Sequence, residues 1–397
     1  MNKIIQYKKL TDICEIITGE WGTEITENSQ NIVSVIRTTN FLNNGKIDIQ
    51  NKELIKREID KKKIEQKQLK RGDIIIEKSG GSPNQPVGRV VFFDLNSNEV
   101  FLCNNFTSIL RVKEDINSKY IFYFLRNNYK KNKVVKYQNK TTGIINLKLQ
   151  NYLNESCIFL PELKIQNKIV NILDNLENII EKNQNYLTHL GVLIKSLFTK
   201  IFGDPLLNDK KEWNFFKIKD IGKIISGSTP STNIPEYWNG EYLWITPAEL
   251  NDDSFIINST NRKLTYLGVK ASSLIELPIG TVLLSSRAPI GKVAIVGENM
   301  FCNQGFKNII PNETINSIYL YYVFKEKKEY LNFLGRGATF KELSKEIVEN
   351  ISIKVPPIEL QNKFAERIEK IEKLKFTIMT IILNTYKTMK KKGVEKD

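Results

Sequence analysis

The sequence predicts an α+β protein with two mainly β globular domains, each followed by a long helix, and with the two helices packed as an antiparallel coiled coil. Three observations support this prediction. The second half of the chain repeats the first, each copy alternates short β-branched runs with turns, and each copy ends in heptad-spaced apolar residues. The 397 residues, 41% of them hydrophobic, suffice for a buried core in each domain.

The internal repeat has a period of about 200 residues and keeps its order along the chain. Its spacing drifts, which indicates that loops have changed in length between two copies of one fold. The matched segments are 10–19 with 218–227, 72–76 with 280–284, 88–90 with 291–293, 103–104 with 302–303, 116–120 with 315–319, and 161–168 with 356–363.

Runs of β-branched and aromatic residues bounded by Gly, Asn and Pro predict the strands of each β domain. One short helix follows in each copy, at 119–127 and 318–326, and its aromatic face is typical of core packing. The predicted strands include 32–36, 73–76, 89–93, 281–284 and 292–296.

Each long helix carries heptad-spaced apolar residues. In the first, one row holds Ile169, Leu176, Asn183, Leu190 and Leu197, and the second row holds Ile172, Ile179, Tyr186 and Leu193. In the second helix the rows hold Phe364, Ile371, Ile378 and Thr385, joined by Ile368, Leu374, Ile381, Ile382 and Met389.

A helix over 162–201 is about 60 Å long, too long to be buried within one domain, so it must pack on another long helix. The nearest candidate is its own duplicate. Association between two chains is the alternative, because the polar Asn183 can fix the register in either case.

Gly203-Asp204-Pro205 ends the first helix and begins the second β domain. We expect the two domains at opposite ends of the antiparallel helices, related by an approximate two-fold axis. The predicted divisions are 1–160 (first β domain), 161–203 (first helix), 204–355 (second β domain) and 356–393 (second helix).

Composition favours a polyanionic partner, because 59 Lys and Arg against 44 Asp and Glu give a net charge of +15. A compositional bias toward Lys is the alternative origin of this excess. Four widely separated cysteines and a single histidine argue against a structural metal site. No apolar run reaches the length of a membrane span and the N-terminus does not resemble a signal peptide, so we expect a cytoplasmic protein.

Catalytic motifs are missing from the sequence. It contains no Asn-Pro-Pro-Tyr or Asp-Pro-Pro-Tyr run and no Gly-rich methyl-donor loop after a strand. The run Gly291-Lys292-Val293 lacks the upstream glycine and the following Ser or Thr of a phosphate-binding loop. We therefore expect a chain without catalytic activity of its own.

Several motifs resemble those of the specificity (S) subunit of bacterial Type I restriction-modification systems, the HsdS family. They are Phe202-Gly203-Asp204-Pro205, Trp244-Ile245-Thr246-Pro247, and the segments 280–288, 303–307 and 356–361. The first copy departs from the pattern, with Val35-Ile36-Arg37-Thr38 in place of Trp-Ile-Thr-Pro and an insertion at 80–86.

The resemblance implies a non-catalytic DNA-recognition subunit. Each target recognition domain would read one half of a bipartite site in double-stranded DNA. The helices would fix the gap and dock two methyltransferase (M) subunits, and restriction (R) subunits indirectly. The methyl donor would bind in those partners, with no cofactor or metal in this chain. The alternatives are a non-catalytic protein- or RNA-binding scaffold with a dimerising stalk, and the recognition subunit of a modification-only enzyme.

Base contacts are expected from polar loops next to glycines, because amide and guanidinium groups must approach base edges closely. The candidates in the first domain are Arg37, Thr38, Lys78, Ser79, Gly80, Ser82, Asn84, Gln85, Lys140, Thr141 and Thr142. Those in the second are Ser228, Thr229, Ser285, Ser286, Arg287, Arg336, Gly337 and Thr339.

Overall fold

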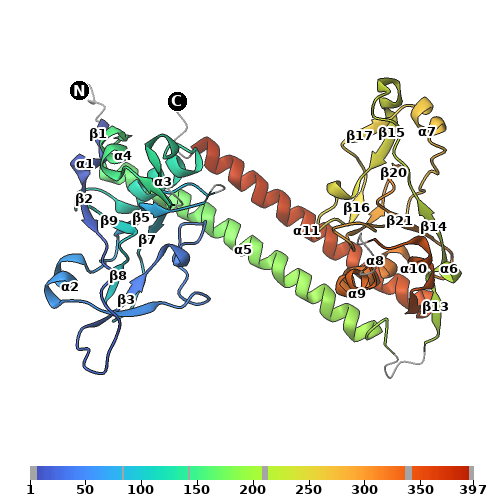
Figure 1. Ribbon diagram of the computed structural model, residues 1–397, viewed down its shortest axis with the longest axis horizontal. Coiled ribbons are helices and arrows are strands. Elements are labelled where there is room, and N and C mark those ends of the chain that lie inside the picture. Colours follow the sequence, from blue (N-terminus) through green and yellow to red (C-terminus); the bar gives the residue numbers. More distant parts are fainter. Residues whose placement is uncertain (1–6, 83–84, 142–143, 208–212, 336–341, 393–397) are drawn as a thin grey trace. The chain divides into compact units, whose positions relative to one another are not determined.

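The structure, a computed structural model, describes residues 7–82, 85–141, 144–207, 213–335 and 342–392 (Figure 1). The chain divides into two compact units. Unit 1 comprises residues 1–180 and 384–397, and unit 2 comprises residues 181–383. None of the helices in the described part of the chain has the length and apolar character that crossing a bilayer requires.

Unit 1 is built on an antiparallel four-stranded sheet and a three-stranded sheet. The first has the order β2 (Cys14–Thr18), β9 (Thr107–Val112), β5 (Ile74–Glu77), β7 (Val90–Phe92). The second has the order β4 (Ile55–Glu58), β3 (Ile32–Ile36), β8 (Phe101–Cys103), with β3 and β8 parallel. A smaller sheet pairs β1 (Tyr7–Lys9) with β12 (Cys157–Phe159). Another has the order β10 (Gln138–Thr141), β11 (Ile144–Leu147), β6 (Ser79–Gly80).

The central strand β5 is buried on both faces, which is why it reads as an unbroken isoleucine run. Ile74 and Ile76 face the core that holds α3 (Ser118–Lys130), whereas Ile75 faces the core shared with β3 and β8. The remaining helices of unit 1, apart from the long ones, are α1 (Leu10–Ile13), α2 (Lys61–Lys67), α4 (Leu149–Glu155), η1 (Thr38–Asn40) and η2 (Val135–Tyr137).

Unit 2 contains a five-stranded sheet of order β14 (Gly222–Ser226), β21 (Lys307–Pro311), β18 (Val282–Leu284), β19 (Val293–Val296), β16 (Ile256–Ile257). A second sheet has the order β17 (Arg262–Leu264), β15 (Trp238–Ile245), β20 (Phe301–Cys302), and β13 (Phe215–Lys217) pairs with β22 (Ser352–Lys354). The short helices are α6 (Ile218–Ile221), α7 (Tyr266–Ala271), α8 (Ser317–Glu326), α9 (Lys328–Leu334), α10 (Lys345–Asn350), η3 (Pro235–Tyr237) and η4 (Pro247–Glu249).

The two units repeat one topology. The order β2-β9-β5-β7 in unit 1 corresponds to β14-β21-β18-β19 in unit 2, and the parallel pair β3-β8 corresponds to β15-β20. The predicted fold class, two β-rich copies each followed by a long helix, is confirmed.

The long helices are α5 (Leu163–Phe202) and α11 (Ile358–Lys392). In unit 2 the end of α5 packs on the start of α11, with the rings of Phe198 and Phe202 centred 5.7 and 5.1 Å from that of Phe364. In unit 1 Met389, near the end of α11, packs against the core that includes Val170 of α5. Opposite ends of the two helices therefore meet, as in the antiparallel pair that the sequence predicted.

One row of the predicted α5 seam is wrong by one residue. Ile172 and Tyr186 are 44% and 58% exposed, whereas Leu173 and Ile180 are only 5% and 6% exposed. The sequence has apolar residues three and four positions after each member of the Ile169 row except the last, so the pattern allows a seam on either side. The helix packs through the row that follows four positions later, and the other row stays at the surface.

A buried glutamine fixes the start of each long helix to its β domain. The side chain of Gln166 accepts a hydrogen bond from the backbone N–H of Asn117 (2.9 Å) and donates one to the carbonyl of Pro161 (2.7 Å). Gln361 accepts the equivalent bond from Asn316 (2.8 Å). Because Asn117 and Asn316 also cap α3 and α8, the short and long helices share one anchor in each copy.

A second anchor joins the same helices two to three turns further along each long helix. The hydroxyl of Tyr123 donates to Asp174 (2.6 Å) in unit 1, and that of Tyr322 donates to Glu372 (3.1 Å) in unit 2. Burial, reinforced by neighbouring carboxylates, raises the pKa of both tyrosines, so the hydroxyls remain protonated donors.

Candidate nucleic-acid interface

In unit 1 an arginine ties the Arg37–Thr39 loop to the central sheet. Arg89 binds Glu77 through two hydrogen bonds of 3.0 Å, and its Nη2 also donates to the carbonyl of Thr38 (3.2 Å). The backbone N–H of Arg37 donates to Asn40 (3.1 Å), while its side-chain Nε is buried without a hydrogen-bond partner. The loop is therefore held by its backbone.

The 78–85 loop meets the β10-β11 hairpin beside this site. The N–H groups of Lys78 and Ser79 both donate to the carbonyl of Phe106 (2.9 and 3.1 Å), and the Ser79 hydroxyl donates to Asn146 on β11 (2.6 Å). Partial burial lowers the pKa of Lys78. Gly80, at φ 126°, adopts a conformation that L side chains rarely reach.

The structure thus brings three of the predicted first-domain segments into one region. Ser82 and Gln85 close the loop with paired backbone hydrogen bonds of 3.0 Å. Lys140 and Thr141 lie on β10, with their backbones paired to β11. Asn84 and Thr142 lie outside the described residues.

In unit 2 the loop after β14 contacts the loop after β20. The N–H of Ser228 donates to the carbonyl of Cys302 (3.0 Å), and the hydroxyl of Thr229 donates to the side chain of Gln304. Both residues therefore lie next to 303–307, one of the segments that carried the family resemblance.

Ser285 and Ser286 are fully buried. The Ser285 hydroxyl donates to the carbonyl of Pro289 (2.8 Å) and accepts from the N–H of Lys292 (2.8 Å), so its hydrogen bonds are used inside the domain. The backbone N–H of Ser286 donates to Gly305 (2.8 Å), and its buried hydroxyl has no partner. Both serines shape the loop from within.

Arg287 lies at the surface, where Glu342 holds it. Its Nε is 3.1 Å from one carboxylate oxygen of Glu342, and the other oxygen is 3.4 Å from the ammonium of Lys307. Half of the Arg287 side chain is exposed. The remaining second-domain candidates, Arg336, Gly337 and Thr339, lie outside the described residues.

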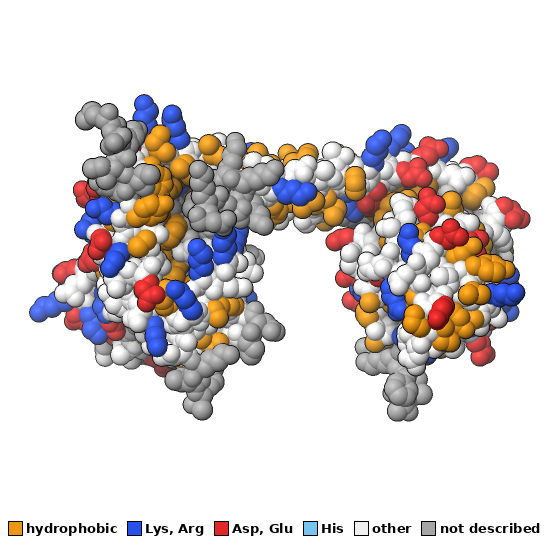
Figure 2. Space-filling model, turned by 90° about the horizontal axis from the view of Figure 1, so that it is seen from above, with side chains coloured by type: hydrophobic (Ala, Val, Ile, Leu, Met, Phe, Trp, Pro, Cys, Tyr) orange, Lys and Arg blue, Asp and Glu red, His pale blue; other side chains and the backbone are white. Residues whose placement is uncertain are grey.

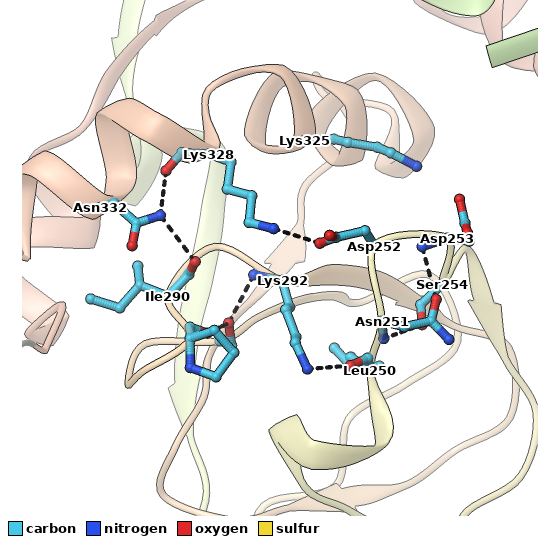
Figure 3. A network of polar contacts seen from close by, with 12 residues as sticks. Leu250, Asn251, Asp252, Asp253, Ser254, Ile290, Lys292, Lys325, Lys328 and Asn332 are labelled. Atoms are coloured by element: carbon cyan, nitrogen blue, oxygen red, sulfur yellow. Dashed lines mark hydrogen bonds and ion pairs between the residues drawn. The ribbon is translucent and has the colours of Figure 1, made fainter. Parts of the chain in front are cut away.

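Lys292 is held by hydrogen bonds to backbone carbonyls of the same domain. Figure 3 shows its ammonium donating to the carbonyl of Leu250, and it also donates to that of Pro247 (3.3 Å). Lys328 pairs with Asp252 on the other side of a pocket of about 490 Å³. These bonds hold the 285–292 loop against the 247–254 turn, so the lysine that resembled a phosphate-loop residue has a structural role.

Sequence reasoning missed the groups that organise these loops, which are side chains except for the backbone carbonyl of Phe106. Arg89, Phe106 and Asn146 in unit 1, and Gln304 and Glu342 in unit 2, all lie outside the predicted set. The signal for Gln304 was present, because 303–307 belongs to the motif set, but nothing in the pattern placed it beside Thr229.

Charge is spread over both units. Basic and acidic side chains are interspersed on the visible face of each unit (Figure 2), so the excess of basic residues does not gather in one patch there. Among the described residues, no group of three or more His, Cys, Asp and Glu side chains is arranged to hold a metal ion.

Comparison with known proteins gives one consistent family. The Type I restriction modification DNA specificity domain (Methylase_S) matches residues 2–189 and again 210–387. The chain is 48% identical to the Type I restriction enzyme MjaIX specificity subunit of Methanocaldococcus jannaschii over 158 residues, 39% of this chain and 37% of that protein.

Other relatives match over more of their length. The chain is 25% identical to the MjaX specificity subunit of the same organism, over 95% of this chain and 92% of that protein. It is 27% identical to the EcoR124I/EcoR124II specificity subunit of Escherichia coli, over 64% and 63%. The crystal structure of an S subunit from M. genitalium shares the fold with a TM-score of 0.63 at 12% identity, covering 99% of this chain and 96% of that chain.

Proposed function

Because the chain belongs to the Type I restriction-modification DNA specificity family, we propose that each of its two β-rich domains reads one half of a bipartite DNA site. The chain is a DNA specificity subunit with two recognition domains, the non-catalytic component of its complex. The observation that carries the proposal is the repeat of one topology in two units, each with a glutamine-anchored long helix.

We assign the reading surfaces to the loop regions described above. In the first domain these are the Arg37–Thr39 loop, the 78–85 loop and the β10-β11 hairpin. In the second they are Ser228–Thr229, Arg287 and the loop that contains Gln304. The buried Ser285 and Ser286 support the loop, and base contact falls to its exposed neighbour Arg287.

The proposed division into recognition domains at 1–160 and 204–355, with helices at 161–203 and 356–393, follows from the repeat. The paired helices fix the number of unread base pairs between the half-sites, as a rigid link does in dimeric DNA readers. Figure 2 shows apolar side chains at the surface of the helical segment. We propose that this apolar surface docks two methyltransferase subunits, which bind the methyl donor, and through them the restriction subunits.

The exposed large apolar residues on the two helices are Leu163, Ile165, Ile172, Ile179, Tyr186, Val192 and Leu193 on α5, and Leu374, Phe376, Met379, Ile381, Leu383 and Tyr386 on α11. An exposed apolar row of this length marks a protein contact surface.

The test is to coexpress the chain with the methyltransferase subunit from its own source and to map the methylated sites. We expect two short defined sequences separated by a fixed number of unspecified base pairs, and no methylation by the chain alone. Replacing residues 1–155 with the corresponding domain of a relative should change one half-site only. Methylation by the chain alone, or a change in both half-sites after one swap, would contradict the proposal.

A further inference from the structure

An arginine outside the predicted set is held over two tryptophans in the second domain. Arg262 begins β17, and its guanidinium carbon lies 3.5 Å from the ring centroid of Trp238 and 5.2 Å from that of Trp244. The Arg262 side chain is exposed, although the rings beneath it are almost fully buried at 8% and 2%.

The two rings form a fixed platform that is joined to a predicted DNA-contact loop. They meet edge to face with centroids 5.1 Å apart. The indole N–H of Trp244 donates to the carbonyl of Ser228 (3.1 Å), and that of Trp238 donates to the carbonyl of Ser231 (3.0 Å). Arg262 is therefore positioned through the same loop that presents Thr229 to Gln304.

The charge of Arg262 has no carboxylate partner within the described part of the chain, whereas several other arginines there are paired with carboxylates. Arg89 binds Glu77 and Arg111 binds Asp73. Stacking engages the flat face of a guanidinium and leaves its N–H groups, which lie in the plane, free to donate. Arg262 thus presents an oriented, unused set of donors.

The first domain contains a similar stack with a different outcome. Arg57, on the corresponding edge strand β4, lies 4.3 Å from the ring centroid of Trp21. Its side chain is only 15% exposed, and its guanidinium is 3.6 Å from Glu24. Arg57 therefore shows what a stacked arginine looks like when its role is structural.

We propose that Arg262 is a specificity-determining residue of the second domain and that its N–H groups bind the edge of a guanine in the second half-site. The proposal rests on the proposed function. Guanine offers two adjacent acceptors in the major groove, O6 and N7, which match the fork of an arginine, and this is the commonest specific contact between proteins and DNA. Holding the guanidinium in place before DNA arrives reduces the conformational entropy lost on binding.

The experiment uses the full chain assembled with its methyltransferase subunit and the bipartite site found by methylation mapping. Affinity is measured for that site and for duplexes with each base pair of either half-site substituted. We compare Arg262→Lys, which keeps the charge but loses the fork, with Arg57→Lys as the matched control. Arg262→Lys should lower affinity for the mapped site about 5- to 150-fold and remove the preference at one G·C pair of the second half-site. Arg57→Lys should leave all base preferences unchanged.

Three outcomes would overturn the inference. A uniform loss of affinity on every duplex would make Arg262 a phosphate contact, and unchanged DNA binding with reduced thermal stability would make it a structural stack only. A mapped second half-site without any G·C pair would also exclude the guanine contact. Failure of the proposed function looks different, because the wild-type complex would then recognise no bipartite site at all.

Discussion

Replacing Gln361 with leucine tests whether the buried glutamine anchors the second long helix. Gln361 is fully buried and makes three hydrogen bonds: it accepts from Asn316 (2.8 Å) and donates to the carbonyls of Pro356 (2.7 Å) and Thr314 (3.2 Å). Leucine has a similar volume but no polar atoms, so Gln361→Leu leaves all three backbone groups without this partner.

The expected cost follows from the burial of those groups. The Pro356 carbonyl bond is fully buried and its loss costs about 1–3 kcal/mol, while the two partly buried bonds add roughly 0.5–1.5 kcal/mol each. Gln361→Leu should therefore destabilise unit 2 by roughly 2–6 kcal/mol. Asn362→Ala, which removes an exposed side-chain bond to Asn316, should cost less than about 1 kcal/mol.

Tryptophan fluorescence during urea unfolding separates the two units, because unit 2 holds Trp213, Trp238 and Trp244 whereas unit 1 holds only Trp21. Gln361→Leu should shift most of the fluorescence transition to lower urea. The matched variant in unit 1, with leucine at position 166, should leave that transition in place while part of the helical circular dichroism is lost earlier. An unchanged transition for Gln361→Leu would refute the anchor.

Three further predictions concern other surfaces. Ile172→Asp should leave the unfolding midpoint near that of wild type but prevent co-purification with the methyltransferase subunit. Leu173→Asp should lower the midpoint, because the carboxylate at position 173 is placed in the buried seam. Equal effects of the two substitutions on the unfolding midpoint would contradict the seam register. Arg287→Ala should relax base preference in one half-site by about 1–3 kcal/mol in a binding assay, and a uniform loss of affinity would instead indicate a phosphate contact. At pH 8 a thiol reagent should rapidly modify only the exposed Cys157 of the folded chain. Burial raises the pKa of the Cys302 thiol to about 12, and the Cys14 and Cys103 thiols are also buried with raised pKa values. Mass spectrometry that found several thiols equally modified would contradict this prediction.

The sequence predicted the features that depend on repeated pattern. The strand Ile74–Glu77 and its counterpart Val282–Leu284 follow from continuous apolar runs, which are typical of strands buried on both faces of a sheet. The start of each long helix follows from the repeated segment 161–168 and 356–363, in which the structure shows Gln166 and Gln361 making the same hydrogen bond. Because of the duplication, each of these patterns occurs twice in the chain.

The interface was harder to predict, because composition says which residues are polar but not which way they face. Ser285 and Arg287 are two positions apart in one polar loop, yet the serine hydroxyl is used within the domain and the arginine reaches the surface. Arg262 carries no motif, and its role depends on Trp238 and Trp244, which fold beneath it. A property of this kind arises from the tertiary structure and leaves no local pattern.

The error in the predicted α5 register has a physical explanation, because the row that the sequence analysis placed in the seam is apolar although it is exposed. A helix that only paired with its duplicate would need one apolar seam, and polar residues would be expected at Ile172 and Tyr186. These positions are apolar and exposed although the neighbouring Leu173 and Ile180 already provide the buried contact. A second apolar row that the chain itself does not cover is costly to solubility unless another protein covers it. The ambiguity that misled the sequence prediction is therefore what a helix needs if one face binds its own duplicate and the adjacent face binds a partner subunit.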